Sequence, residues 1–440
     1  MNYSEACAYI VERYKTKGKL GLDGMERILA RMGAPHKDLR VIHVAGTNGK
    51  GSNCAYLHSV LKEAGYKVGM FTSPHLRRFN ERFIINGVEI SDDDFAFYIK
   101  KISEVIKDEK ASFFEIFTLM ALDYFKQERV DFAIIEVGIG GRLDSTNIVN
   151  PVLCSITAPG LDHQELLGDT PEALALEDAG IIKNNCPVVL YPTPQLNIFE
   201  KICEQKNAPL YCIGNWEYEL SIYNKREDGS VFSVRTNNNF NYKNVEIGLS
   251  GMFQVNNAVH ALLCIEALIL EGFFISKEAV YKGMKNARWD GRFQIIKKTP
   301  QNPFIVLDGA HNESGALAFR EALRDNFLYR NIVFVLGISK NKEYKKILEA
   351  LFENFFEDFS SPITVICSES NFKAKPAFEL CETVKEILFE QNKEFINVIA
   401  ISDYEKAFSE AFKIATLNDG VLVITGSLYL VGDVSALINK

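Results

Sequence analysis

A glycine-rich loop between an apolar run and a helical pattern constrains this chain more than any other feature. In the segment VIHVAGTNGKGSNCAYLHSVLKEAGY, residues 41–66, three glycines follow the expected strand, Lys50 lies inside the loop and Ser52 opens the expected helix. Glycines let backbone N–H groups turn toward phosphate oxygens, a lysine neutralises outer phosphates, and a hydroxyl can face Mg²⁺. The strict G-x-x-x-x-G-K-[ST] pattern fails, because Val44 stands at its first glycine and Gly51 separates Lys50 from Ser52. A tight turn would explain the glycines alone, but the whole set predicts a site for ATP or a close relative.

Short Val- and Ile-rich runs alternate with longer helical patterns in two parts of the chain. The first set lies at 41–46, 67–72, 132–138, 152–157 and 187–191, and the second at 304–309, 332–339, 363–368, 397–402 and 420–426. Buried parallel strands joined by helices produce such runs. The segment 211–250 instead has polar alternation, which favours an antiparallel insertion with one solvated face. We therefore expect two α/β domains, 1–295 and 296–440, with a β insertion near 211–250.

Composition and charge exclude several classes of protein. Hydrophobic residues make up 47% and charged residues 24% of the 440 residues, which is typical of a globular chain rather than a disordered one. Lys and Arg number 49 against 57 Asp and Glu, so the formal charge of −8 gives no excess of positive charge that would indicate nucleic-acid binding. The first 14 residues lack a basic segment followed by an apolar run, and charged or polar residues interrupt the apolar stretch 258–274. We expect a cytoplasmic protein with no membrane partner.

The nine cysteines form no C-x-x-C pair, which indicates small buried residues rather than ligands or disulfides.

Motifs along nearly the whole chain resemble one family. GTNGKGS at 46–52 and TSPHL at 72–76 resemble the Mur ligase superfamily, specifically its folylpolyglutamate synthase and dihydrofolate synthase branch. The further matching segments are EVGIGGRLDSTN at 136–147, LDHQELLGDT at 161–170, LEDAGIIK at 176–183 and VLDGAHN at 306–312. The resemblance implies an α/β protein with a Mur-ligase-type P-loop ATPase domain, a smaller Rossmann-like C-terminal domain and an active site in the cleft between them.

The same resemblance implies a reaction in folate biosynthesis. ATP would activate the carboxylate of dihydropteroate, of a (tetrahydro)folate polyglutamate, or of both as an acyl phosphate, and the amine of L-glutamate would then form the amide. A carboxylate is a poor electrophile at neutral pH, so phosphate supplies the leaving group, and the protein mostly positions reactants and neutralises charge. The implied cofactors are ATP and Mg²⁺, and a monomer is expected.

The resemblance assigns roles to individual residues. It implies ATP contacts at Asn48, Gly49, Lys50, Gly51, Ser52, Asn257, Arg292 and Asp308. It implies Mg²⁺ contacts at Ser52, Ser73, Glu136 and His163, and catalytic roles for Lys50, His163, Asp178 and His311. Taken alone, His163 is more often a hydrogen-bonded loop histidine, Asn257 an exposed or capping amide, and Arg292 a salt-bridge residue between domains.

For the pterin-bearing substrate, the resemblance implies contacts at Arg142, Leu143, Asp144, Phe114 and Glu115, and in the segment 22–27. Arg142 and Asp144 follow an expected strand in a glycine-flanked loop, which fits a binding site. Phe113 and Phe114 lie in a helical pattern, where aromatic residues are more often part of the core.

One position departs from the family pattern. The family's E-K-A-G-I motif has a lysine that becomes carbamylated and helps position a second metal, whereas this chain has Asp178 between Glu177 and Ala179. The modification cannot occur on an aspartate. Asp178 keeps a negative charge but reaches less far, so either a water bridges the gap, the helix lies closer, or the second metal site is weak.

Two alternatives remain open at this point. One is a Mur-type ligase that joins a different amino acid to a different acid, because the ATP motifs are shared more widely than the substrate contacts. The other is an ATP-binding paralogue without catalytic activity, which is suggested only by Asp178.

Overall fold

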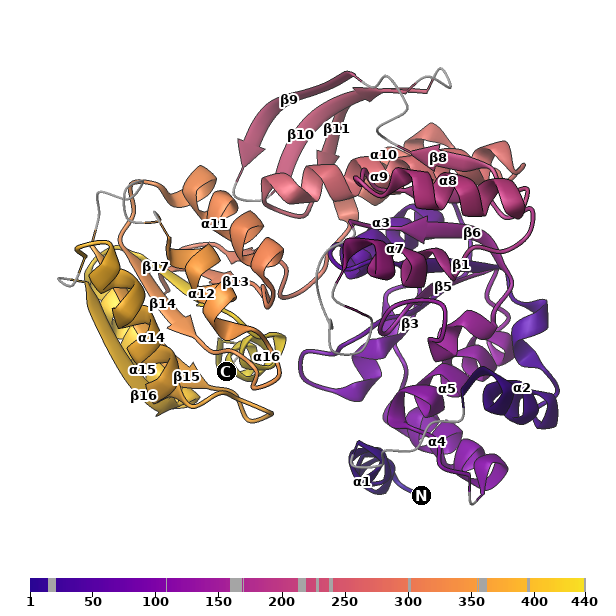
Figure 1. Cartoon of the computed structure of the whole chain (residues 1–440), viewed down its shortest axis with the longest axis horizontal. Coiled ribbons are helices and arrows are strands. Elements are labelled where there is room, and N and C mark those ends of the chain that lie inside the picture. Colours follow the sequence, from indigo (N-terminus) through magenta and orange to yellow (C-terminus); the bar gives the residue numbers. More distant parts are fainter. Residues whose placement is uncertain are drawn as a thin grey trace. The chain divides into compact units, whose positions relative to one another are not determined.

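The computed structural model describes residues 1–14, 21–107, 109–158, 168, 170–212, 219–226, 229–236, 240–299, 302–353, 355, 362–393 and 396–438 (Figure 1). The chain forms two compact units. Unit 1 comprises Met1–Leu220, Ser233–Lys243 and Asn257–Ala287, and unit 2 comprises Ser221–Phe232, Asn244–Asn256 and Arg288–Lys440. The boundary at 295/296 stays a prediction.

An eight-stranded sheet organises unit 1, in the order β4-β3-β2-β5-β1-β6-β7-β8. Its strands are β1 Val41–Ala45, β2 Val68–Phe71, β3 Phe83–Ile85, β4 Val88–Glu89, β5 Phe132–Glu136, β6 Pro151–Ile156, β7 Val188–Leu190 and β8 Leu210–Cys212. The six strands from β2 to β8 in this order pair in parallel, and only β3 and β4 add antiparallel pairs at one edge. The apolar runs of the sequence are therefore buried parallel strands, whose carboxyl ends share one edge of the sheet.

Helices pack around this sheet and enclose its apolar side chains. They are α1 Tyr3–Arg13, α2 Gly21–Arg31, α3 Lys50–Glu63, α4 Asp92–Ile106, α5 Phe113–Gln127, α7 Pro171–Ala179, α8 Leu196–Gln205, α9 Met252–Leu270 and α10 Lys277–Asn286. One core cluster gathers side chains of α1, α2, α4 and α5 with β1, β2 and β5, and another gathers those of α7 and α8 with β6 and β7. Helix α3 packs on β1, β2 and β5 and lies so close to α10 that a Cβ on Gly283 would come within 2.4 Å of Val60 Cα.

Local sequence signals explain where several of these helices begin. Ser91 and Ser276 accept hydrogen bonds from the third residue of α4 and of α10, as N-cap residues do. Thr170 caps α7, and Pro171 occupies its first position, where the missing N–H costs no hydrogen bond. Such caps fix the helix starts, while burial of one face holds each helix on the sheet.

A separate three-stranded sheet has the order β11-β10-β9, with β9 at Glu219–Arg226, β10 at Gly229–Arg235 and β11 at Asn241–Ile247. These strands lie in the segment where the sequence pattern predicts a β insertion.

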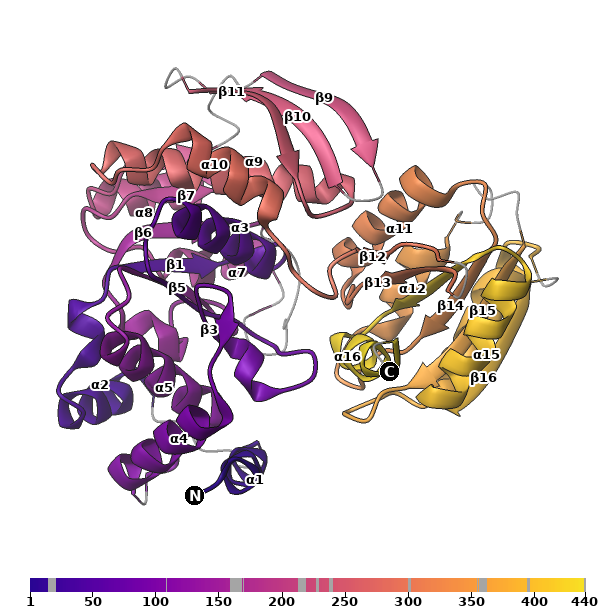
Figure 2. The same ribbon diagram turned by 180° about the vertical axis from the view of Figure 1, so that it is seen from behind.

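A six-stranded sheet organises unit 2, in the order β12-β13-β17-β14-β15-β16 (Figure 2). Its strands are β12 Gln294–Ile296, β13 Phe304–Leu307, β14 Ile332–Leu336, β15 Ile363–Glu369, β16 Asn397–Asp403 and β17 Val421–Thr425. All pairs are parallel except β12 with β13. Its helices are α11 Glu313–Phe327, α12 Tyr344–Phe352, α14 Ala377–Glu390, α15 Tyr404–Leu417 and α16 Leu428–Ile438. A hydrophobic core on one face of the sheet gathers side chains of α11, α12 and α14. Helices α15 and α16 also pack against strands of this sheet but contribute no residue to that core. This is the expected Rossmann-like arrangement.

All nine cysteines are free thiols, and eight of them are buried. The structure thus agrees with the prediction that they are small core residues.

Candidate active site

The glycine-rich loop lies at the carboxyl edge of the unit 1 sheet, between β1 and α3. Gly46 and Gly49 have φ angles of +115° and +88°, in the region that side chains rarely adopt. A Cβ on Gly46 would lie 2.5 Å from Thr157 Oγ1, and the N–H groups of Thr47 and Asn48 both donate to the Ala158 carbonyl at 3.2 Å. The loop is therefore folded closely over the end of β6, and Gly49 directly precedes the N-terminus of α3.

Lys50 places its charge at the centre of this loop. Its Nζ donates to the Gly46 carbonyl at 2.7 Å and to the Thr47 carbonyl at 3.3 Å. Ser52 is buried in the first turn of α3, where backbone N–H groups point out of the helix toward the loop. An ammonium, a helix N-terminus and a hydroxyl in one place form an arrangement that holds phosphate groups.

Glu136 and Ser73 meet beside the loop. Glu136 is the last residue of β5, is only 3% exposed, and pairs in register with Val44 of β1. Its Oε2 accepts the Ser73 N–H at 2.7 Å, so the TSPHL and EVGIGG segments converge as expected. Among the described residues no three His, Cys, Asp or Glu side chains gather as a preformed metal site. One carboxylate with hydroxyl groups fits Mg²⁺, which takes oxygen ligands and shares them with substrate phosphates. His163 lies outside the described residues.

Asp178 reaches the loop from helix α7. It is 6% exposed and interacts with the Gly46 N–H and the Lys50 ammonium, which both lower its pKa. Burial is the larger effect and raises the pKa of this carboxyl to about 7. Asp178 therefore reaches the phosphate loop from α7, and the three possibilities for the second metal site stay predictions.

The segment Arg142–Asp144 follows β5 and contacts α7 at Glu177, the residue before Asp178. Arg142 donates from Nε and Nη2 to Glu177 Oε1 at 2.9 and 2.7 Å, and its side chain is 57% exposed. Leu143 is 66% exposed. Both side chains are accessible to a ligand, as the prediction of a substrate contact requires.

Asp144 instead holds this loop together. Its Oδ2 accepts the N–H groups of Gly138 and Ile139, and its Oδ1 accepts the N–H and hydroxyl of Thr146 at 2.9 and 2.6 Å. Thr146 Oγ1 in turn lies 2.9 Å from Nε2 of the buried His43. Burial raises the pKa of Asp144, although its hydrogen bonds lower it. The geometry gives this carboxylate a role in shaping the loop.

Phe114 and Glu115 lie in the first turn of α5. Phe114 packs so closely on Gly138 that a Cβ there would come within 2.5 Å of its ring. Glu115 forms a capping box with Ser112, accepting the Ser112 N–H and hydroxyl at 2.8 Å, and its other oxygen accepts the Gly21 N–H at 3.1 Å. The carboxylate of Glu115 is thus engaged in starting α5 and anchoring α2, the helix that contains the predicted segment 22–27.

Asn257 approaches the loop from helix α9. Its Oδ1 would lie 2.6 Å from a Cβ on Gly49, so this contact requires a glycine. One turn later, buried His260 Nε2 lies 2.9 Å from Ser155 Oγ, which donates to Asn53 Oδ1 at 3.0 Å. This polar network ties α9, β6 and α3 together beneath the phosphate loop.

Arg292, Asp308 and His311 belong to unit 2. Asp308 follows β13 and accepts the N–H groups of Phe293 and Ala310, each at 2.7 Å. Burial raises the pKa of Asp308 to about 6, against a lowering by Arg292 and these N–H groups. His311 Nδ1 donates to the Gly309 carbonyl at 2.7 Å. The two motifs around Arg292 and Asp308 therefore meet at the carboxyl end of β13, where a doubly wound sheet presents ligand-binding groups.

Comparison with known proteins identifies the family. Residues 44–265 match the family model of the Mur ligase middle domain, and residues 292–437 match that of the dihydrofolate synthetase C-terminal domain. The dihydrofolate synthase/folylpolyglutamate synthase of Bacillus subtilis is 35% identical over 448 residues, covering 98% of both chains. The chain belongs to the folylpolyglutamate synthase/dihydrofolate synthase family.

Solved structures of this family share the fold. E. coli FolC in complex with DHPP and ADP has a TM-score of 0.86 at 27% identity, covering 100% of this chain and 98% of that one. A bifunctional folylpolyglutamate synthase/dihydrofolate synthase with Mn, AMPPNP and L-glutamate bound has a TM-score of 0.84 at 27% identity, with the same coverage of both chains. The family resemblance and the α/β fold class predicted from the motifs are confirmed.

Some residues of this family member were not singled out by sequence reasoning. The sequence patterns do not single out Glu177, the partner of Arg142, nor the network of Asn53, Ser155 and His260. The sequence feature that could have indicated this network is His260, which interrupts an apolar helical pattern three residues after Asn257, because a polar residue buried in such a helix needs a hydrogen-bond partner.

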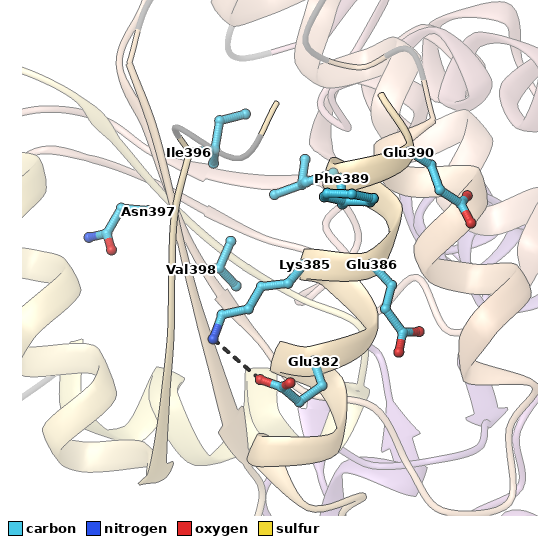
Figure 3. A pocket seen from close by; sticks show the side chains of 9 residues that line it. Glu382, Lys385, Glu386, Phe389, Glu390, Ile396, Asn397 and Val398 are labelled. Carbon is cyan, nitrogen blue, oxygen red and sulfur yellow. Dashed lines mark hydrogen bonds and ion pairs between the residues drawn. The ribbon is translucent and has the colours of Figure 1, made fainter. Parts of the chain in front are cut away.

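Other features lie apart from the predicted site residues. A groove of about 780 Å³ runs between α14 and the start of β16, and Figure 3 shows Lys385 beside Val398 and bonded to Glu382. None of the predicted site residues that the structure describes lines this groove. Helix α9 is long and apolar enough to cross a membrane, but 78% of its most apolar window is buried, and it contains His260 and Glu266. It is a core helix of unit 1 over most of its length.

Proposed function

We infer that the chain is an ATP-dependent ligase that joins L-glutamate to dihydropteroate, to reduced folates, or to both. The observation that carries this inference is the phosphate loop at the carboxyl edge of the sheet, with Lys50 at its centre and Glu136 at the end of the adjacent strand. Membership of the family supports the substrate class. We also propose a cytoplasmic monomer without nucleic-acid or membrane partners; the formal charge of −8 supports only the absence of a nucleic-acid partner.

The chemistry asked of the protein is charge neutralisation and positioning. In the first step a carboxylate oxygen of the acceptor attacks the terminal phosphorus of ATP, which gives an acyl phosphate and ADP. In the second step the glutamate amine attacks the acyl carbon, phosphate leaves, and one proton is released. The ammonium of Lys50 and the N-terminus of α3 would stabilise the charge on the phosphates. Asn48, Gly49, Gly51 and Asn257 would shape the nucleotide pocket.

A divalent cation fits the oxygen donors beside the loop. Glu136, Ser52 and Ser73, together with His163, would hold Mg²⁺, which when bound neutralises phosphate charge. The Ser73 N–H donates to Glu136 Oε2 at 2.7 Å and so helps to hold this carboxylate beside the loop.

In unit 2, Asp308 fixes the loop that carries His311, and Arg292 supplies a cation beside it. His311 Nδ1–H donates to the Gly309 carbonyl, so Nε2 is the ring atom that would take up a proton. We assign His311 the role of accepting the proton of the attacking amine.

The decisive experiment supplies purified protein with Mg-ATP and L-glutamate and offers dihydropteroate and tetrahydrofolate separately. ADP formation and product mass are measured together. A product one glutamyl unit heavier from both acceptors establishes a bifunctional synthase, and a product from one acceptor alone identifies the branch. ADP formation only with other amino acids and acids would favour a different Mur-type ligase, and nucleotide binding without turnover would favour a non-catalytic paralogue.

A further inference from the structure

Glu177 holds Arg142 through both its side chain and its main chain. Its Oε1 accepts Nε and Nη2 of Arg142 at 2.9 and 2.7 Å, and its carbonyl accepts the Arg142 N–H at 2.9 Å. The Glu177 side chain is only 15% exposed, against 57% for Arg142. The carboxylate is therefore fixed at the end of α7, while the guanidinium that it holds faces outward.

Two glycines allow the end of α7 and the segment 141–142 to approach each other closely. A Cβ on Gly141 would lie 2.5 Å from the Glu177 carbonyl oxygen, and a Cβ on Gly180 would lie 2.3 Å from Arg142 Cβ. Neither contact admits a larger residue without a shift of backbone. The end of α7 thus determines where the main chain of Arg142 lies, and Glu177 determines where its side chain points.

The next residue of the same helical turn faces the nucleotide loop. Asp178 interacts with the Gly46 N–H and Lys50, while Glu177 faces the segment 141–144. Successive residues of a helix point about 100° apart, so one turn of α7 contacts two loops at once. The two acidic residues can therefore be tested separately for effects on the two ligands.

We propose that Glu177 is a positioning residue that orients the Arg142 guanidinium for the acceptor acid. Resting on the proposed function, the proposal assigns to Arg142 the recognition of an anionic or hydrogen-bond-accepting group of that acid. A guanidinium presents five N–H donors in a rigid fork, and fixing two of them against Glu177 aims the others. A ligand that meets a side chain already in place avoids the cost of immobilising it, which corresponds to an affinity gain of about threefold to tenfold.

The test compares Glu177→Ala, Glu177→Gln and wild-type protein in the ligation assay, with KM measured for each substrate. Glu177→Ala should raise KM for the acceptor about threefold to tenfold, with KM for ATP unchanged. Glu177→Gln keeps an oxygen that accepts from Arg142 and should restore most of the loss. Glu128→Ala removes the exposed Lys67–Glu128 pair, whose atoms lie 2.8 Å apart, and serves as the matched control.

A second variant decides whether Glu177 acts through Arg142. In an Arg142→Ala background, adding Glu177→Ala should raise the acceptor KM no further. Equal effects of Glu177→Ala on all substrates, additive effects in the double variant, or a lower acceptor KM in either Glu177 variant would overturn the proposal. Failure of the wild-type protein to ligate either acceptor would instead count against the proposed function, so the two failures are distinguishable.

Discussion

Glu266 offers a quantitative test of how burial affects a titratable group in this fold. Its side chain lies within the apolar helix α9 and is fully buried. Oε1 accepts from the Thr236 hydroxyl at 3.3 Å, and Oε2 has no hydrogen-bond partner in the described part of the chain. Burial raises the pKa of this carboxyl from 4.5 to about 8, and Thr236 lowers it by a smaller amount. The charged form is therefore strongly disfavoured in the folded protein.

The sign of the pH effect follows from the two states. The folded chain keeps the proton up to about pH 8, whereas the unfolded chain releases it near pH 4.5, so this group lowers stability as the pH rises between these values. The loss approaches about 1.4 kcal/mol per pH unit and amounts to about 3 kcal/mol between about pH 5 and about pH 7.5. Glu266→Gln removes the titration but keeps the shape. The free energy of unfolding of the variant, relative to wild type, should therefore increase by about 3 kcal/mol over this interval.

Urea unfolding of both proteins, followed by tryptophan fluorescence at the two pH values, measures this difference. Comparing the two pH values cancels the cost of burying the amide, because that cost does not depend on pH. Glu271→Gln, at an exposed position beyond the end of the same helix, is the control and should show no such trend. A stability difference between Glu266→Gln and wild type that stays constant with pH would refute the reasoning.

Three further substitutions test the site and the fold. Lys50→Ala should lower ATP cleavage by about a hundredfold or more, because it removes the charge at the centre of the loop; an unchanged circular dichroism spectrum with retained turnover would contradict the phosphate-loop assignment. In the absence of divalent metal, the affinity of the wild-type protein for ADP should fall as the pH rises, because the Asp178 carboxyl, with a pKa of about 7, becomes negative and repels phosphate. Asp178→Asn should flatten this pH dependence. Fluorescent-nucleotide titration measures this, and parallel curves for the two proteins would exclude it. Ser112→Ala should lower the free energy of unfolding by about 1 kcal/mol in urea titrations, because it removes the cap of α5; equal stability would show that the capping box contributes nothing.

Local patterns were enough to predict the phosphate loop and its neighbours. The strand at 41–45 and the helix from Lys50 follow from an apolar run, three glycines and a helix-forming segment that are adjacent in sequence. The meeting of Ser73 with Glu136 was implied by motifs that follow adjacent parallel strands, and such strands bring their carboxyl ends to one edge.

Contacts that depend on helix placement were harder to predict. Whether Asp178 reaches the loop depends on where α7 packs, which no local pattern determines. Glu115 shows the opposite case: its place three residues after Ser112 matches the capping-box pattern, so a role at the helix start was readable from sequence. The role of Glu177 was not readable, because its partner is 35 residues away in the chain.

The paired glycine contacts between α7 and the segment 141–142 have a consequence for recombination among relatives. Gly141 and Gly180 each leave room for the backbone of the opposite segment, so the two surfaces fit only as a matched pair. A chimera that exchanges α7 alone would place a foreign helix end on a native loop and misplace both at once. A chimera that exchanges 138–147 together with 171–183 would keep both glycine contacts between matching segments. We therefore expect the fold to tolerate crossover points that lie outside these two segments.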